Sequence, residues 1–156
     1  MYRYNRITID LDAIRHNYLL MADYLPPAVR VMVVVKANAY GHGMAEVAKT
    51  VVEAGCRDLA IAIPEEGIAL RQSGLQDVNI LVLGAINEHS IDPSVQADLT
   101  LTIFEPRMVQ LIDACASRMG KTAFVHIKLD TGMGRIGLRT DEEAMALQAS
   151  LAQAHN

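Results

Sequence analysis

The sequence has little excess charge and no long apolar run, and each shortage excludes a class of protein. Its 14 Lys and Arg against 18 Asp and Glu give a net charge of -4, and the charges are well mixed, so no basic surface for nucleic acid is expected. The apolar runs are far shorter than a bilayer requires, and Arg6, Asp10 and Asp12 break up the amino terminus, which argues against a signal peptide. These features favour a cytoplasmic protein that binds neither membrane nor nucleic acid.

Cysteine is also scarce, with only Cys56 and Cys115 in the chain. Both lie in apolar or glycine-containing surroundings, so buried free thiols are favoured over a disulfide. The spacing of the cysteines matches no metal site, and none is expected. At 156 residues and 51% hydrophobic composition, the chain is long enough for one domain with a core.

Short β-like runs alternate with segments of helical period along the whole chain. This alternation predicts an α/β fold with a parallel sheet and helices outside it. Pro106 suits a first helical turn, Gly55, Gly74 and Gly120 suit helix ends, and Thr140 to Glu143 reads as a capping box. The expected strands are Val29 to Val35, Leu59 to Ile63, Asn79 to Leu83, Leu99 to Phe104 and Thr122 to Leu129, and an earlier helix, Asp10 to Ala22, is closed by Pro26 and Pro27.

Lys36 ends the apolar run 31–35 and opens into 37–43, a loop of small residues with one tyrosine and one histidine. Charged side chains are rarely buried without a partner or a chemical role, and lysine is the amine that forms Schiff bases with carbonyl cofactors. Lys36 is therefore the candidate nucleophile. The simpler explanation is a strand-terminal lysine whose amine reaches solvent. His42, between two glycines, is expected to brace the turn.

The strand expected over Thr122 to Leu129 has one apolar and one polar face. Residues of one parity are apolar, whereas the other parity carries Phe124, His126, Lys128 and, just beyond, Asp130. If the sheet curves into a barrel, this second face points inward, and the same parity places Lys36 inward at the carboxyl end of the first strand. His126 also has a simpler explanation, as a core histidine bonded to a backbone carbonyl.

The stretch Lys128 to Gly137, KLDTGMGRIG, can be interpreted in two ways, and the first is a dinucleotide-binding turn. Its Gly132-x-Gly134-x-x-Gly137 spacing follows a strand and precedes a helix, as a dinucleotide-binding turn does. That signal is weak, because an arginine stands in the loop and the supporting acidic residue about 20 residues later is not found.

Both VVVKANAYGHG (33–43) and KLDTGMGRIG (128–137) resemble hallmark stretches of bacterial alanine racemases, and Ile9 to Ile14 with Asn17 and Tyr18 resembles the family's amino-terminal helix. The resemblance implies a (β/α)8 TIM-type barrel, here incomplete with about five βα units. It implies that residues 1-156 are the amino-terminal portion of the barrel, with the carboxyl-terminal β-domain absent. It also implies an isomerase that interconverts L-alanine and D-alanine with pyridoxal 5'-phosphate as cofactor, by a two-base mechanism. The D-alanine would be used for peptidoglycan precursors.

The resemblance also implies roles for four residues. Lys36 would hold pyridoxal phosphate as an internal aldimine and act as one of the two bases, and Tyr40 would hydrogen-bond the cofactor phosphate. Arg135 would lie near the cofactor's phenolic oxygen and bind the substrate carboxylate. Lys128 matches a lysine that is often carbamylated in the family and then orients the arginine. Simpler explanations are a solvated loop arginine for Arg135 and an aromatic packed over the barrel mouth for Tyr40.

The family's opposite base is a tyrosine from the carboxyl-terminal domain of the partner subunit in a homodimer. No stretch of this sequence corresponds to that domain, so the chain alone is expected to be inactive. Because five barrel-type strands are expected where a closed barrel requires eight, the sheet is expected to be open. Two other functions remain: a racemase of serine or of broader specificity, and a non-catalytic folding or cofactor-binding fragment.

Overall fold

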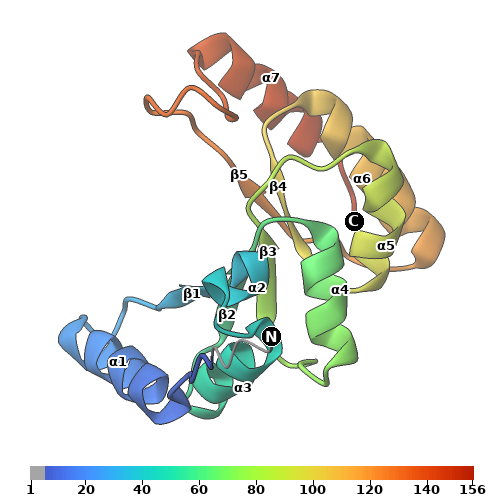
Figure 1. Cartoon of the computed structure of the whole chain (residues 1–156). Helices are drawn as coiled ribbons and strands as arrows, with labels where there is room; N and C mark the ends of the chain where they lie inside the picture. Colours follow the sequence, from blue (N-terminus) through green and yellow to red (C-terminus); the bar gives the residue numbers. More distant parts are fainter. Residues whose placement is uncertain (1–5) are drawn as a thin grey trace, which may run out of the picture.

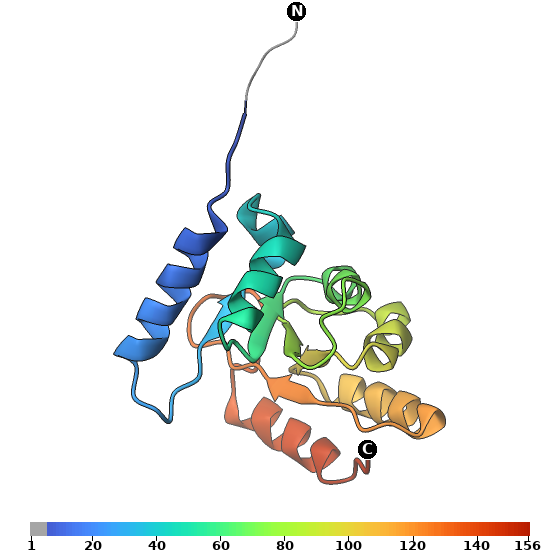
Figure 2. The same cartoon turned by 90° about the horizontal axis from the view of Figure 1, so that it is seen from below.

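The computed structural model describes residues 6–156, and residues 1–5 lie outside its described part. A single parallel sheet runs through the molecule, and its helices lie along one face (Figure 1). Seen along a perpendicular direction, helices of successive units follow one another in an arc around the sheet (Figure 2). The α/β arrangement with outer helices that the sequence predicts is therefore confirmed.

The strands are β1 (Met32–Val34), β2 (Asp58–Ile61), β3 (Asn79–Val82), β4 (Thr100–Ile103) and β5 (Val125–Ile127). The helices are α1 (Leu11–Tyr24), α2 (Lys36–Tyr40), α3 (Met44–Glu53), α4 (Pro64–Gln72), α5 (Ile91–Gln96), α6 (Pro106–Met119) and α7 (Asp141–Leu151), with a 3-10 turn, η1 (Glu88–Ser90), before α5. All five expected strands are present, although each is shorter than predicted, because pairing ends where the chain turns into a helix or loop.

The strands follow the order β1-β2-β3-β4-β5, and every neighbouring pair is parallel. Within residues 6–156, β1 and β5 have a strand on one side only, which confirms the expected open sheet. A single bridge between Leu129 and Leu138 closes the loop that follows β5.

The helix ends follow the predicted signals. Pro106 is the first residue of α6, whose carboxyl end is capped by Gly120 in the left-handed region at φ 62. Thr140 caps α7 by accepting a hydrogen bond from the backbone N–H of Glu143 at 3.2 Å. The predicted capping box is half formed, because the Glu143 carboxylate accepts from the N–H of Arg139 instead of that of Thr140.

The core lies between the helices and the outer face of the sheet. Alternate strand residues are fully buried there, among them Leu59, Ile61, Ile80 and Leu101, together with Leu70 and other helix residues. Both cysteines are free and buried, as predicted. Met32 and His126 line the concave side, so the inward orientation predicted for these two strand residues is confirmed.

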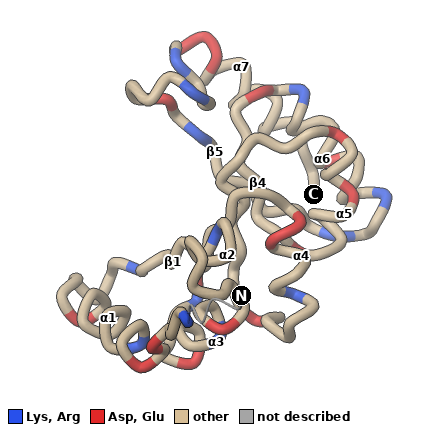
Figure 3. The backbone as a smooth tube through the Cα atoms, viewed as in Figure 1, with Lys and Arg blue, Asp and Glu red and all other residues tan. Residues whose placement is uncertain are grey.

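Along the backbone, the positions of Lys and Arg are interspersed with those of Asp and Glu (Figure 3). Among the described residues, no helix combines the length and the apolar character needed to cross a membrane.

Candidate active site

Lys36 and Arg135 line one pocket at the carboxyl ends of the strands. The pocket has a volume of about 260 Å³, and its remaining lining comes from Ala62, Leu83, Gly84, Ala85 and Ile136. Lys36 lies just beyond β1, after Val35, whereas Arg135 lies on the loop after β5, so the open sheet brings its two edge regions to the same pocket. The Lys36 amine forms no ion pair or hydrogen bond with any described residue.

The residues after Lys36 form a left-handed helical turn where the sequence predicted an irregular loop. Ala37, Asn38, Ala39 and Tyr40 have φ angles of 52, 56, 51 and 54°. For L-residues this conformation costs roughly 1–2 kcal/mol each, because the Cβ approaches the next carbonyl oxygen. Such strain persists only where surrounding contacts over-determine the backbone, and it is most common at functional sites.

Contacts within the turn supply part of that support. The Ala39 N–H donates to Val35 O at 2.8 Å. The Asn38 side chain accepts from Met44 N at 2.8 Å, which satisfies a backbone donor at the start of α3. His42 Nδ1 lies 2.9 Å from Ala39 O, so His42 braces the turn as predicted.

Glu66 supplies further support from outside the turn. Its carboxylate accepts from the N–H of Ala37 at 2.6 Å and from the N–H of Ala62 at 2.7 Å. Glu66 was not among the site residues predicted from the sequence. A usable signal was present, since Pro64 to Glu66 follows a strand and a glutamate at the third helical position commonly reaches back toward the turn.

Asp130 organises the loop that carries Arg135. Its carboxylate accepts from Gly134 N at 2.9 Å and Gly132 N at 3.1 Å, and Arg139 Nε lies 3.2 Å away. These donors hold the pKa of Asp130 below its usual value, the backbone of Gly134 and Gly132 contributing most. The expectation that Asp130 projects into the barrel is therefore wrong, because its carboxylate is turned into its own loop and is only 3% exposed.

Gly137 closes the same loop through a tight backbone approach. Its φ is 123°, and a Cβ here would lie 2.7 Å from Asp130 N. The glycine pattern that suggested a dinucleotide-binding turn thus has a structural explanation, since these glycines shape a loop folded around Asp130.

The other two predicted site residues do not line this pocket. Tyr40 is 64% exposed, and the Lys128 amine donates to the backbone oxygen of Leu129 at 2.8 Å. The prediction that two lysines point at one mouth is not met in this structure, since the Lys128 amine turns back to its own strand end. His126 lies on the inner face, as predicted, but it is exposed and has no carbonyl partner among the described residues, so the core-histidine explanation is wrong.

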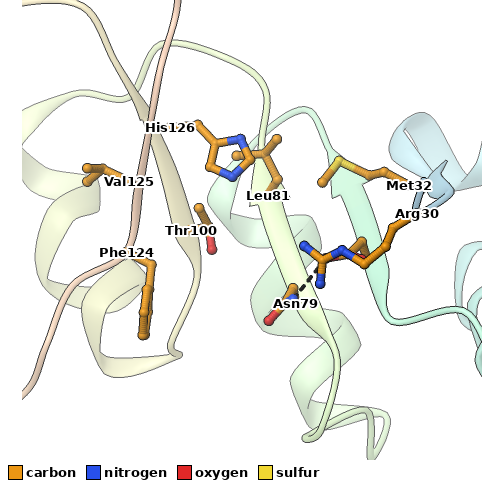
Figure 4. A pocket seen from close by; sticks show the side chains of 9 residues that line it. Arg30, Met32, Asn79, Leu81, Thr100, Phe124, Val125 and His126 are labelled. Carbon is orange, nitrogen blue, oxygen red and sulfur yellow. Dashed lines mark hydrogen bonds and ion pairs between the residues drawn. The ribbon is translucent and has the colours of Figure 1, made fainter. Parts of the chain in front are cut away.

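His126 instead lines a second pocket of about 290 Å³ at the amino ends of the strands (Figure 4). Asp58 is buried there, with its Oδ1 accepting from Asn79 Nδ2 at 2.8 Å and Arg30 Nε 3.5 Å from its Oδ2. This polar layer lies at the end of the sheet opposite to Lys36, so it does not belong to the lysine pocket.

The sequence matches a family model described as alanine racemase, N-terminal domain, over residues 9–156. The chain belongs to this family. The match covers both hallmark stretches, so the resemblance stated from the motifs is confirmed.

Two curated members of the family illustrate the similarity. An alanine racemase from Listeria monocytogenes serotype 1/2a (strain 10403S) is 42% identical over 149 residues, which are 96% of this chain and 39% of the relative. An alanine racemase from Desulforamulus reducens is 45% identical over 138 residues, 88% of this chain and 37% of the relative. The chain thus spans about two fifths of the length of the relatives that it matches.

Solved structures of racemases agree with the fold. A Bacillus anthracis alanine racemase with bound L-Ala-P matches with a TM-score of 0.87 and 37% identity, over 97% of this chain and 39% of that one. A histidine racemase from Leuconostoc mesenteroides matches with a TM-score of 0.83 and 25% identity, over 97% and 42%. The five-stranded sheet corresponds to the amino-terminal part of the TIM barrel in the alanine racemase structures.

Proposed function

We propose that residues 1–156 form the amino-terminal, cofactor-carrying portion of a pyridoxal-phosphate-dependent alanine racemase, and that Lys36 is the lysine that binds the cofactor. One observation carries the proposal: Lys36 and Arg135 line the same pocket at the carboxyl ends of parallel strands, the position where barrel enzymes place their active sites. Membership of the family supports the cofactor and the reaction class.

The pocket residues fit the cofactor chemically. Lys36 offers an amine without an ion-pair partner among the described residues. Arg135 forms no described hydrogen bond or ion pair, so its guanidinium is free for a carboxylate or a phenolic oxygen. The cofactor, when bound, supplies a conjugated ring that accepts the electrons released when the α-proton of an amino acid leaves.

The protein must then bind, orient and exchange protons. Lys36 would act as a base on one face of the substrate Cα, and Arg135 would bind the substrate carboxylate. Tyr40, which lies outside the Lys36–Arg135 pocket and is 64% exposed, would donate to the cofactor phosphate. Lys128 is the candidate for carbamylation. Inversion needs a second acid on the opposite face, and no tyrosine follows Tyr40 in this sequence. We assign that second group to a tyrosine of the partner subunit in a homodimer of the complete enzyme.

The identity of the substrate side chain defines a second candidate function, the racemisation of amino acids other than alanine. A histidine racemase shares this fold with a TM-score of 0.83, so the fold accepts side chains larger than a methyl group. Racemisation of serine or of a broader set of amino acids is therefore the alternative, and a substrate panel on the complete enzyme distinguishes it from alanine racemisation. A non-catalytic fragment is the third candidate, which the next experiment tests.

Addition of pyridoxal phosphate to the chain should give the visible absorbance of a lysine-bound cofactor, and Lys36→Ala should abolish it. Borohydride reduction followed by peptide mapping should place the label on Lys36. Lys49→Ala, at an exposed position of α3, is the matched control and should leave the absorbance unchanged. A label on Lys121 or Lys128 with Lys36 unmodified would overturn the assignment.

A further inference from the structure

The carboxyl ends of β1 and β2 are joined by the carboxylate of Glu66 where their backbone pairing stops. The last ladder bond is donated by Val35 N to Ala60 O at 2.9 Å. Beyond it, the left-handed turn leaves the Ala37 N–H without a strand partner. That N–H and the N–H of Ala62 both donate to Glu66, at 2.6 and 2.7 Å.

The Glu66 carboxylate accepts hydrogen bonds from two backbone N–H groups, those of Ala37 and Ala62, at the point where the pairing of β1 with β2 ends. The bond from the Ala62 N–H is partly buried, whereas Ala37 and its bond to Glu66 are exposed to solvent. Bonds to a carboxylate are about twice as strong as neutral ones. Because four residues of the turn carry strained φ angles, the turn needs an external anchor at its first residue. Glu66 contacts Ala37, the residue directly after Lys36.

Glu66 is itself held on a rigid element. It occupies the first turn of α4, where its carboxylate also lies 3.4 Å from the N–H of Ile63 and favours the positive end of the helix. The adjacent Gly67 packs so closely on the sheet side that a Cβ there would lie 2.8 Å from Leu99 Cδ2. The position of α4, and with it the carboxylate, is therefore fixed by the core.

We propose that Glu66 is the positioning residue for Lys36: by anchoring the left-handed turn to β2 and α4, its carboxylate directs the Lys36 amine into the pocket beside Arg135. This inference rests on the proposed function of Lys36 as the cofactor lysine. Glu66 touches neither cofactor nor substrate in this assignment, and it acts only through the backbone of Ala37. Its two acceptor oxygens are both used, so an amide, with one acceptor oxygen and a donor group, satisfies only one of the two N–H groups.

The test compares the wild-type chain with Glu66→Ala, Glu66→Gln and the control Glu65→Gln, which removes a neighbouring exposed charge from the same helix turn. Three readouts are recorded: amide exchange of Ala37 and Ala62, the NMR resonance of Lys36 after ¹³C-reductive methylation, and the rate of borohydride-trapped attachment of pyridoxal phosphate to Lys36. Methylated Lys49 is the internal reference. Thermal unfolding confirms that each variant is folded.

We expect Glu66→Ala to speed exchange at Ala37 and Ala62, to shift the Lys36 resonance but not that of Lys49, and to slow cofactor attachment about ten- to a hundredfold, the range typical of a misplaced reacting group. In all three readouts Glu66→Gln should lie between Glu66→Ala and the wild type, and Glu65→Gln should match the wild type. An unchanged Lys36 resonance and attachment rate in folded Glu66→Ala or Glu66→Gln would overturn the positioning role while leaving the cofactor lysine in place. Wild-type chain that never attaches cofactor at Lys36, yet shows the Glu66-dependent resonance shift, would refute the proposed function and keep the positioning role.

Discussion

Gly84 shows how closely the strand ends approach one another beneath Lys36. Its N–H donates to Ala62 O at 3.2 Å, and a Cβ on Gly84 would lie 2.5 Å from the same oxygen. Ala62 is also bonded to Glu66, so a shift at Gly84 is transmitted to the anchor of the lysine turn. Any side chain at this position must push the end of β3 away from the end of β2.

Gly84→Ala is therefore expected to lower the free energy of unfolding by about 1–3 kcal/mol, as overpacked sites do. Urea denaturation followed by circular dichroism measures the change. The neighbouring exposed Ala85 provides the control, because Ala85→Ser should stay within about 0.5 kcal/mol of the wild type. Equal stability of the two variants would show that the strand ends can separate without loss.

The Asp130 carboxylate makes the Arg135 loop sensitive to acid. Because the pKa of Asp130 is lowered in the folded chain by the N–H groups of Gly134 and Gly132, its stabilising effect is fully present above the ordinary aspartate pKa. That effect is lost as the pH falls through the lowered folded pKa. The loop should therefore stay ordered at neutral and mildly acidic pH and loosen only in stronger acid.

Amide exchange at Gly132 and Gly134 checks this expectation, after correction for the intrinsic pH dependence of exchange. Protection should fall in the acid range in the wild type, whereas Asp130→Ala, which removes the oxygen that accepts from both glycines, should show low and pH-independent protection. Protection that is constant down to strong acid in the wild type would contradict the role of the ionised carboxylate.

At the scale of elements, the left-handed turn and α3 depend on each other through Asn38. Asparagine tolerates the left-handed region better than alanine does, and its side chain also accepts from Met44 N at the start of α3. Replacing Asn38 by alanine removes both the residue's tolerance of positive φ and the hydrogen bond that its side chain accepts at the start of α3.

Asn38→Ala should reduce the free energy of unfolding by about 1–2 kcal/mol, the range found for lost helix caps. Lys49→Ala, on the exposed side of α3, is the comparison and should change it by less than about 0.5 kcal/mol. If both substitutions have the same small effect in urea denaturation, the turn does not rely on Asn38.

Helices and strands were predictable from the sequence where the residues that specify them lie within or next to the element. The apolar runs located β2 and β3, Pro106 marked the start of α6, and Gly120 marked its end. The turn over residues 37–40 was not predictable, because small residues alone do not specify positive φ angles and the stabilising carboxylate of Glu66 lies 29 residues from Ala37.

The candidate site shows the same division between local and distant contacts. The motifs identified Lys36 and Arg135, and the structure brings both to one pocket. They did not reveal that Asp130 turns into its own loop, or that Lys128 bonds the backbone of Leu129. Those contacts depend on how the loop after β5 folds on itself, which the period of a strand cannot encode.

At the scale of the molecule, the open sheet leaves apolar surface at its β5 edge. Ile127 and Leu129 are 50% and 56% exposed, and they border an apolar groove of about 410 Å³ between β5 and α7. The β1 edge is likewise unpaired within residues 6–156, and the exposed Val34 lies on it. Unpaired edges with exposed apolar side chains promote association between chains.

The isolated chain should therefore self-associate as its concentration rises. Sedimentation velocity measures the oligomer distribution, and amide exchange should be faster in β1 and β5 than in β2 and β3 at concentrations where the monomer predominates. Ile127→Lys places a charge on the free edge and should shift the distribution toward monomer, because edge lysines oppose pairing between sheets. Leu20→Lys, at an exposed position of α1, adds the same charge away from the sheet edges and should leave association unchanged. A monodisperse wild-type monomer at high concentration, with edge amides as protected as those of β2, would show that the open edges are blocked by the chain itself.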